Sequence, residues 1–385
     1  MFRVQPLLLI AALACPATAV AWSQPARVGE PGSSPASVAV AKRGGVRLLM
    51  FHDRRLTVAR GPAGSGLSDQ QLLSEHASSG QLAALPDGRT VVAWTEQLAD
   101  YAAIPAAATA TTGSRFRTFL VGPADATFVT SAVGATGLAL TAYQRASSAA
   151  VQVTRWNAAG RVQQPQPLEI VPRSSPPAVA VGGRHAVVAW CGGPGGTEVH
   201  YATGRPDRPL HAPRAVPGAE CGAFLTIAVA PTGEAVMAWK RPSDQRNEVS
   251  IRQADGSFGP PQVLAGTTLP SPSLVAITPH GRSAVTWSPS AGATDGLLLI
   301  DGHVERTPCP YQLAFDPRGR VIGQRGINNA FDLCTRSGRG RWHYEPLRYG
   351  FNPLYAAVPG LRAVAAYVYE PGAVPRTVVS SERTS

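Results

Sequence analysis

Lysine is almost missing from this sequence, and charged residues as a class are scarce. Lys42 and Lys240 are the only two lysines, and Asp, Glu, Lys and Arg make up 15% of the 385 residues. The formal net charge is +11, but basic residues form no run longer than a pair such as Arg54-Arg55. A nucleic-acid-binding protein usually gathers its basic residues on one face or segment. The dispersed charge therefore argues against nucleic acid as a partner.

The familiar catalytic motifs are absent as well. The sequence has no phosphate-binding glycine loop, no Gly-x-Ser-x-Gly elbow and no His-Glu-x-x-His pair. Cys-x-x-Cys and His-x-His spacings are also missing, so we expect neither a bound metal nor a cofactor. These absences favour a binding role over a catalytic one.

Long apolar runs are lacking too, and the run from Leu7 to Ala14 is too short to span a bilayer. It follows Arg3 and precedes small residues, the pattern of a secretory signal peptide. We therefore predict a signal peptide over 1–21 and one exported domain over 22–385, secreted or in the cell envelope, with no transmembrane segment. Lipidation of Cys15 is an alternative, although the usual leucine of a lipobox is missing.

One segment that is present, Thr226 to Trp239, is repeated along the chain. Two apolar runs flank the turn Pro231-Thr-Gly233, where proline fixes φ and glycine accepts a positive φ, so the unit is a β-hairpin. Seven further copies of the turn occur near residues 42, 86, 135, 182, 279, 317 and 359. In every copy except the one at Gly319, an aromatic residue follows the turn glycine by six or seven positions. These aromatics are Phe51, Trp94, Tyr143, Trp190, Trp239, Trp287 and Tyr367, and their spacing predicts four short strands per repeat.

The last strand of each repeat has its own signature, in which a proline lies three residues after one apolar residue and three before another. Leu210 to Val216 is one example, and proline belongs on an edge strand, so this strand is the outermost. The same signature appears at Trp22 to Val28, whereas the final repeat ends after its third strand, Thr377 to Ser380. We therefore predict that the N-terminal strand completes the last repeat and closes a ring, which removes an exposed sheet edge.

With these features the chain resembles the secreted bacterial β-propellers of the WD40-like and sialidase-like groups. The turn-and-tryptophan hairpin carries the general resemblance, and Asp255-Gly-Ser-Phe258 is similar to a degraded Asp-box of the sialidase-like propellers. The fold expected is all-β, a single propeller of eight four-stranded blades, or seven if a weak copy belongs to its neighbour. The resemblance implies no activity, because the Arg-Ile-Pro segment and arginine clamp of sialidases cannot be assigned here.

The cysteines fit an exported protein. If Cys15 leaves with the signal peptide, four cysteines remain, and an even number favours two disulfides in an oxidising compartment. The sequence leaves three pairings open. We prefer Cys191 with Cys221 and Cys309 with Cys334, because each pair closes a short loop and joins adjacent strands or blades.

The repeat also predicts where a ligand would bind. We expect Trp94, Trp190, Trp239 and Trp287 in the core between blades, because large aromatics fill cores more often than they mark sites. Loops leaving the second strand of each blade share one face around the central channel, where ligands commonly bind. The loop from Gln97 to Ser114 is expected to be a tolerated insertion or a lid. The candidate binding residues on this face are Arg145, Lys240, Arg241, Glu96 and Glu370.

Two functions follow from these residues. The first is a monomeric, non-enzymatic binding module whose basic rim, Arg145, Lys240 and Arg241, engages an acidic glycan or an extracellular protein. The second is a carbohydrate-active hydrolase or lyase, since glycoside cleavage needs two carboxylates facing one bond. The acids near loops are Glu96, Asp100, Asp244, Glu248, Asp295 and Glu370. Acids in such loops usually cap turns, so the binding module is the preferred hypothesis.

Overall fold

The computed structural model describes the chain over residues 21–22, 26–41, 45–62, 67–98, 102–171, 175–253, 255–264, 274–287, 295–315, 319–327, 330–338, 340–347, 350–357, 363–369 and 376–383. Within these ranges the secondary structure is β-strand and turn, in agreement with the all-β prediction. No helix of the described ranges is long and apolar enough to cross a membrane. The predicted signal peptide up to residue 20, Cys15, Asp100 and Glu370 lie outside them.

Five sheets have four antiparallel strands each, joined in chain order. The first contains β3 (Ser34–Val40), β4 (Gly45–His52), β5 (Arg55–Pro62) and β6 (Asp69–Ser74). The others contain β15 (Ala178–Gly182), β16 (His185–Gly192), β17 (Glu198–Gly204) and β18 (Arg214–Glu220); β19 (Ala223–Val229), β20 (Ala235–Lys240), β21 (Asn247–Ile251) and β22 (Gln262–Val263); β23 (Leu274–Ile277), β24 (Ser283–Trp287), β25 (Gly296–Ile300) and β26 (His303–Thr307); and β27 (Tyr311–Phe315), β28 (Val321–Ile327), β29 (Ala330–Arg336) and β30 (His343–Leu347).

An eight-stranded sheet holds two runs with the same four-strand order. They are β7 (Ala77–Ala84), β8 (Thr90–Gln97), β9 (Ala103–Ala110) and β10 (Arg117–Leu120), then β11 (Ala126–Val133), β12 (Leu138–Arg145), β13 (Ala150–Asn157) and β14 (Gln166–Ile170). One residue pair, Ala103 with Ala126, links β9 to β11.

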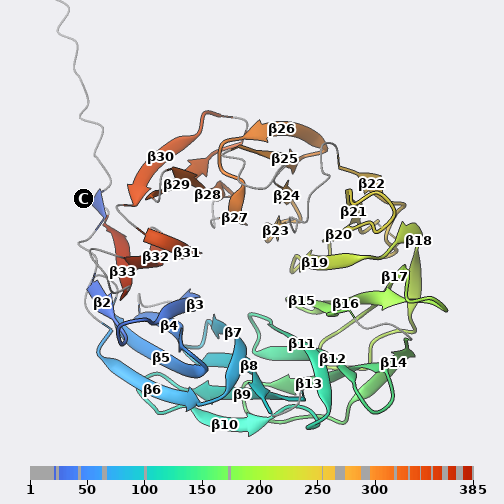
Figure 1. Ribbon diagram of the computed structural model, residues 1–385, viewed down its shortest axis with the longest axis horizontal. Helices are drawn as coiled ribbons and strands as arrows, with labels where there is room; N and C mark the ends of the chain where they lie inside the picture. The colour runs from blue at the N-terminus through green and yellow to red at the C-terminus, as the bar shows by residue number, and fades with distance from the viewer. Residues whose placement is uncertain are drawn as a thin grey trace, which may run out of the picture.

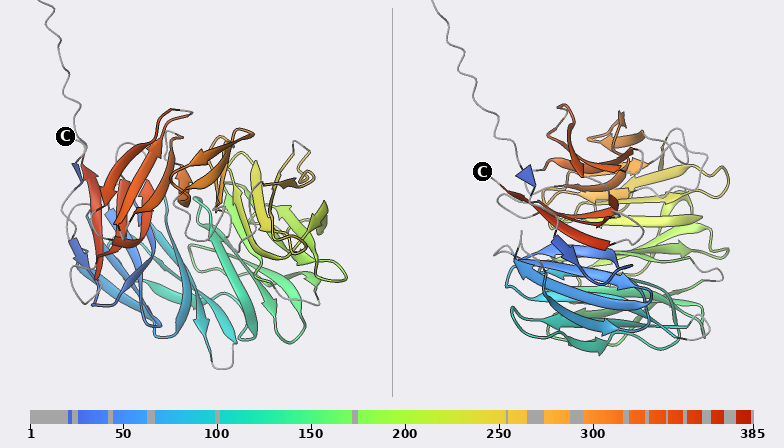
Figure 2. Two further views of the ribbon diagram at one scale, coloured as in Figure 1. Left: turned by 45° about the horizontal axis from the view of Figure 1, so that its top comes forward. Right: turned by 60° about the vertical axis from the view of Figure 1, so that its left-hand side comes forward.

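The N-terminal strands pair with the C-terminal strand of the chain. A five-stranded sheet contains β31 (Gly350–Ala357), β32 (Ala363–Tyr369), β33 (Arg376–Arg383), β1 (Ala21–Trp22) and β2 (Ala26–Val28). In it, β2 lies antiparallel to β33, with Ala26 opposite Val379 and Val28 opposite Thr377. The two ends of the chain therefore share one sheet, and the dark blue and red strands lie side by side in Figures 1 and 2.

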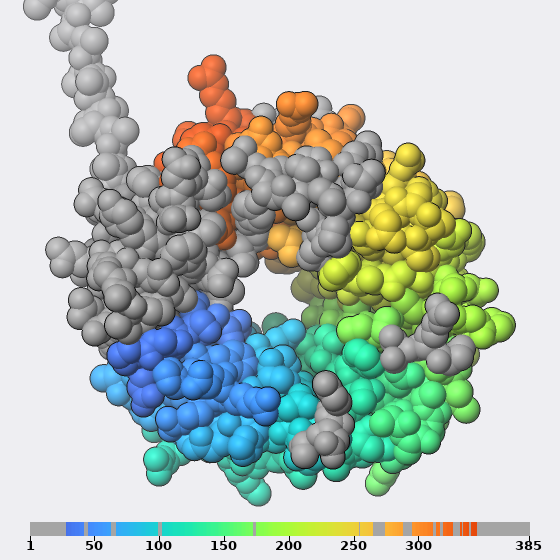
Figure 3. All heavy atoms as spheres, in the orientation of Figure 1, coloured from blue at the N-terminus to red at the C-terminus, as the bar shows by residue number. Residues whose placement is uncertain are grey.

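The sheets stand in a ring around a central opening (Figures 1 and 3). The strands nearest the opening are β3, β7, β11, β15, β19, β23, β27 and β31 (Figure 1). Radial repetition of four-stranded antiparallel sheets about an axis is the β-propeller architecture, so the predicted fold class is confirmed at that level.

The four repeat tryptophans, Trp94, Trp190, Trp239 and Trp287, are buried in the core between neighbouring sheets, as predicted. The exposed fraction is 0% for Trp190 and 1% for Trp239 and Trp287. Trp239, on β20, shares a buried cluster with Val187 and Val199 of the preceding sheet. Each tryptophan therefore joins its own sheet to a neighbour.

The prediction of a long loop from Gln97 to Ser114 was wrong. Residues Ala103–Ala110 form β9, the third strand of their run. The composition, rich in alanine, has low intrinsic strand propensity. Ala107 and Ala108 are 0% exposed, however, so the strand lies between two sheets where small side chains fit. Tertiary packing overrides the local preference here.

Both preferred disulfides are confirmed. Cys191, on β16, bonds Cys221, which lies between β18 and β19, with a Cα–Cα distance of 5.3 Å. Cys309, after β26, bonds Cys334 on β29, with a Cα–Cα distance of 6.3 Å. The second bond therefore joins two neighbouring sheets, whereas the first fixes a β-strand end to the connection leading into the next sheet.

Replacing both Cys309 and Cys334 by alanine should destabilise the protein by about 3 kcal/mol, because a disulfide of this loop length restricts the unfolded chain by that order. Urea unfolding of the oxidised protein and the double variant measures the difference. A control with reductant present in both samples should remove most of it. Equal stability of the two oxidised proteins would contradict the prediction.

Candidate functional site at the channel mouth

Three of the predicted binding residues occupy equivalent positions at one face of the ring. Glu96 pairs with Ala77, Arg145 with Ala126 and Lys240 with Ala223, each at the end of a second strand and the start of an innermost strand. We call this face, where β8, β12, β16 and β20 end, the channel mouth. The sequence-based assignment of these residues to a common face agrees with the strand register.

At the channel mouth, tryptophan indole groups hold carboxylates in place. Trp94 Nε1 donates to Glu96 Oε2 at 2.8 Å, Trp190 Nε1 to Glu169 Oε2 at 2.7 Å, and Trp239 Nε1 to Glu248 Oε2 at 3.0 Å. The rings themselves are buried, so the N–H group is the polar end of a core side chain. Each carboxylate is thereby fixed to the rigid interface between sheets.

Arg145 forms a bidentate ion pair with Asp125. Its Nε lies 3.1 Å from both carboxylate oxygens, and Nη2 lies 3.0 Å from Oδ2. The Ser147 hydroxyl also donates to Asp125. This hydroxyl and the guanidinium lower the pKa of Asp125 below its usual range. Arg145, which was predicted to be part of a basic rim, is therefore already neutralised by the carboxylate of Asp125.

Arg241 belongs to a larger network. It bonds Asp244 through Nε at 2.8 Å and Glu248 through Nη1 at 3.1 Å, and the Glu248 residue is 1% exposed. The guanidinium hydrogen bonds lower the pKa of Asp244 to about 2, whereas burial raises the pKa of Glu248. The neighbouring Lys240 is only 3% exposed, and burial lowers its pKa. This part of the mouth is charge-matched rather than simply basic.

A histidine between two carboxylates, His200, forms a site that the sequence interpretation missed. Glu169 Oε2 lies 2.7 Å from His200 Nδ1, and Glu198 Oε2 lies 3.0 Å from Nε2. Glu169 Oε1 also accepts the Gly193 backbone N–H at 2.8 Å. A carboxylate on one ring nitrogen fixes the imidazole, and the other nitrogen can then exchange a proton.

No sequence signal pairs Glu169 with His200, because they come from different sheets. Glu169 lies on β14 and His200 on β17, and only the packing of the two sheets brings them together. Among the described residues, the structure shows no direct contact joining Glu96, Arg145 and Arg241. Asp295 is exposed directly before β25. The sequence interpretation placed Glu96, Arg145 and Lys240 on one face, in agreement with the strand register, but did not identify the His200 cluster.

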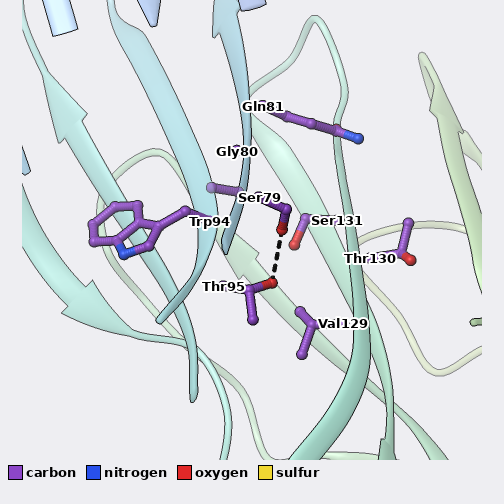
Figure 4. Close-up of a pocket in the computed structure, with 9 residues that line it drawn as sticks. Ser79, Gly80, Gln81, Trp94, Thr95, Val129, Thr130 and Ser131 are labelled. Carbon is purple, nitrogen blue, oxygen red and sulfur yellow. Dashed lines mark hydrogen bonds between the residues drawn. The ribbon is translucent and has the colours of Figure 1, made fainter. Parts of the chain in front are cut away.

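The wall of the opening is uncharged. Within their described bounds, the strands nearest the opening contain no Asp, Glu, Lys or Arg. A cavity of about 250 Å³ lies in this wall between β7 and β11 (Figure 4). Ser79, Thr95 and Ser131 contribute hydroxyl-bearing side chains to its lining, and Ser79 Oγ donates to Thr95 Oγ1 at 2.9 Å (Figure 4).

The described residues contain no group of three or more His, Cys, Asp and Glu side chains that could hold a metal ion. The His200 cluster offers hydrogen bonds and a ring nitrogen that can exchange a proton. The remaining groups at the mouth offer fixed charges in pairs beside a neutral channel wall.

The ring of four-stranded antiparallel sheets makes this chain a β-propeller protein, and its polar face is the candidate site. No family model matches the chain, and no curated protein matches its sequence. Among solved structures, a prolyl endopeptidase is similar with a TM-score of 0.52 and 12% identity over 76% of this chain, which spans 45% of that protein.

Two further structures are similar over most of their own length. A catalytically inactive virginiamycin B lyase from Staphylococcus aureus has a TM-score of 0.48 and 11% identity, covering 81% of this chain and 95% of that one. The β-propeller domain of the Trilobed protease from Pyrococcus furiosus has a TM-score of 0.49 and 8% identity, covering 81% and 96%. At these identities the likeness concerns the fold alone.

The Asp244 ion pair makes a prediction about acid stability. Asp244 has a pKa of about 2 in the folded protein, below the ordinary value of 3.8, so its contribution is present above pH 4 and lost as the pH falls towards 2. The variant Asp244→Asn should be less stable than the wild type at pH 7, and this difference should shrink as the pH falls from about 4 to 2. Urea unfolding at several pH values measures both effects.

Asp53→Asn is the matched control, because the Asp53 side chain is 90% exposed. Its stability should follow that of the wild type across the pH range. A difference between the wild type and Asp244→Asn that stays constant down to pH 2 would count against the ion pair as its source.

Proposed function

We propose that this protein is an exported propeller of eight four-stranded blades, closed by its N-terminal strand. Division of the eight-stranded sheet at the single pair Ala103–Ala126 supports the count of eight. The pairing of β2 with β33 supports closure, because it supplies the outer strand of the last blade. Two disulfides agree with an oxidising, extracytoplasmic compartment. We propose further that it acts as a monomer.

We infer that the protein binds a glycan or a protein partner at the channel mouth. The observation that carries this proposal is the set of polar groups anchored to the inter-blade core beside an uncharged channel wall. Rigid hydrogen-bonding groups around a concave opening lose little entropy when a ligand binds. We assign the rim to Glu96, Arg145 and Arg241, with the buried Lys240 beside Arg241 in the chain and Glu370 proposed from its sequence position.

The charged groups of the rim are already paired with one another. The rim therefore suits a ligand that can replace one member of an ion pair or hydrogen-bond both members. An acidic glycan, the partner favoured by net charge, would compete with Asp125 for Arg145 and with Asp244 for Arg241. A hydroxyl-rich or mixed-charge ligand can instead bond a carboxylate and a guanidinium together. Both ligand classes therefore belong in a binding test.

Binding to a glycan and peptide array should fall by about tenfold or more when Arg145 and Arg241 are both changed to alanine, since charge-assisted hydrogen bonds contribute about 1.5–3 kcal/mol each. The matched control is Arg282→Ala. Arg282 pairs with Asp301 through Nη2 and Oδ2 at 2.8 Å, but it precedes β24 at the opposite face. It should leave binding unchanged. No binding by the wild type, or equal loss in the control, would refute the proposal.

A second candidate function is a carbohydrate-active hydrolase or lyase using acidic groups of the same face. The specific observation in its favour is the His200 cluster, because an imidazole held by one carboxylate is suited to general acid–base catalysis. The His200 side chain is 15% exposed and the Glu198 side chain is 52% exposed. A substrate can therefore displace Glu198 from Nε2 of His200.

Turnover on a polysaccharide panel tests the enzymatic alternative. If His200 transfers a proton, His200→Asn should lower kcat by about a hundredfold or more, whereas Glu96→Ala should have a smaller effect. Inertness of the wild type on the whole panel, or turnover that His200→Asn leaves intact, would rule out this role.

A further inference from the structure

Two exposed phenylalanines at the channel mouth have a backbone conformation that phenylalanine rarely adopts. Phe128 has φ of 51° and Phe224 has φ of 54°, both in the left-handed region. Their exposed fractions are 42% and 45%. Left-handed φ is costly for a bulky residue, by about 1–3 kcal/mol, and persists where the surrounding structure imposes it. Neither ring is buried enough for core packing to explain this conformation.

The same structural device places both rings. On β11 the register jumps between Thr127 and Thr130, and on β19 it jumps between Ala223 and Thr226. Each jump is a β-bulge in which two residues, the first of them phenylalanine, lie opposite one aromatic of the next strand. These opposing aromatics are the repeat residues Tyr143 and Trp239. A bulge redirects a side chain and is often found beside a functional site.

Register irregularities recur at the same end of other innermost strands, between Pro35 and Ser37 on β3 and between Ala77 and Ser79 on β7. The bulge is thus part of the repeat, whereas the exposed phenylalanine is not. Phe128 precedes Tyr143 by the same number of residues as Phe224 precedes Trp239, while β7 has Ser79 at that position. The repeat alone therefore does not require an aromatic there.

The cavity in the channel wall lies beside the Phe128 bulge. Val129, Thr130 and Ser131 of β11 line one side, and Ser79 and Gln81 of β7 line the other. The side chains of Gln81 and Thr130 make no hydrogen bond to the described parts of the chain. Gln81 lines the cavity, and in Figure 4 its side chain and the Trp94 ring point in opposite directions. These uncharged donors and acceptors are free to meet a ligand.

We propose that Phe128 and this cavity form a binding subsite for one ring of an uncharged saccharide. The face of a sugar ring presents C–H groups that can pack on an aromatic side chain, and its hydroxyls need neutral hydrogen-bond partners. Phe128 supplies the aromatic surface, and Gln81, Thr130 and the nearby hydroxyl groups supply the partners. Phe224, two strands further round the opening, supplies a second aromatic surface for a longer chain. This inference rests on the proposed glycan-binding function.

Phe128→Gly is the informative variant, because glycine adopts a positive φ without strain. It should keep or raise the Tm while weakening saccharide binding by about tenfold, the effect of losing one good aromatic contact. Phe128→Trp should restore binding, and Gln81→Ala should weaken it. The probes are neutral hexasaccharides of glucose, mannose and N-acetylglucosamine, with polygalacturonate as the acidic counterpart, measured by calorimetry. Leu120→Ala, on the outer strand β10 with 62% exposure, is the control.

Binding of a neutral probe that depends on Phe128 and Gln81 but not on Leu120 supports the subsite. Neutral binding that survives both Phe128→Gly and Gln81→Ala refutes the subsite and leaves the proposed glycan function in place. Binding of polygalacturonate alone has the same consequence. A marked loss of Tm in Phe128→Gly assigns the ring a structural role and refutes the proposal. No saccharide binding by the wild type refutes both the subsite and the glycan function.

Discussion

The structure depends on one contact that recurs between neighbouring sheets, the burial of a tryptophan side chain from the second strand. The four-stranded sheets are thin, and without this contact each would expose an apolar face to water. Tryptophan fills the interface with a large apolar area, and its N–H group reaches the channel mouth. There it bonds Glu96, Glu169 or Glu248, so the group that stabilises the core also fixes a carboxylate. Scaffold and polar face are therefore physically coupled.

This coupling accounts for the character of the mouth. A carboxylate fixed at a buried interface is costly unless a cation or donor faces it, and each one has such a partner. Arg241 pairs with Glu248 and His200 with Glu169, while Arg145 pairs with Asp125 in the turn directly before β11. The net positive charge of the chain therefore does not predict the charge at the channel mouth. The local ion pairs and the uncharged wall set the electrostatic environment that a ligand meets there.

Much of the architecture could be predicted from the sequence, because it rests on local signals. The turn at Pro231-Thr-Gly233 contains a glycine with φ of 104°, as its chemistry requires, and the regular aromatic spacing marks the second strands. Cysteine positions relative to the strands led to the correct pairing. The strand β9 was missed because its alanines carry a weak local signal, and only burial between sheets explains them.

The sequence left the disulfide pairing as a preference among three, which the structure then decided. It determined the repeat, the all-β class and the face on which Glu96, Arg145 and Arg241 lie. Each of these follows from local turn and strand patterns and from their repetition along the chain. Only the tertiary structure decided that the rim arginines are paired, that Glu169 meets His200, and that Phe128 stands strained beside a cavity. These features depend on contacts between sheets and on bulges in strand register, and neither leaves a pattern among neighbouring residues.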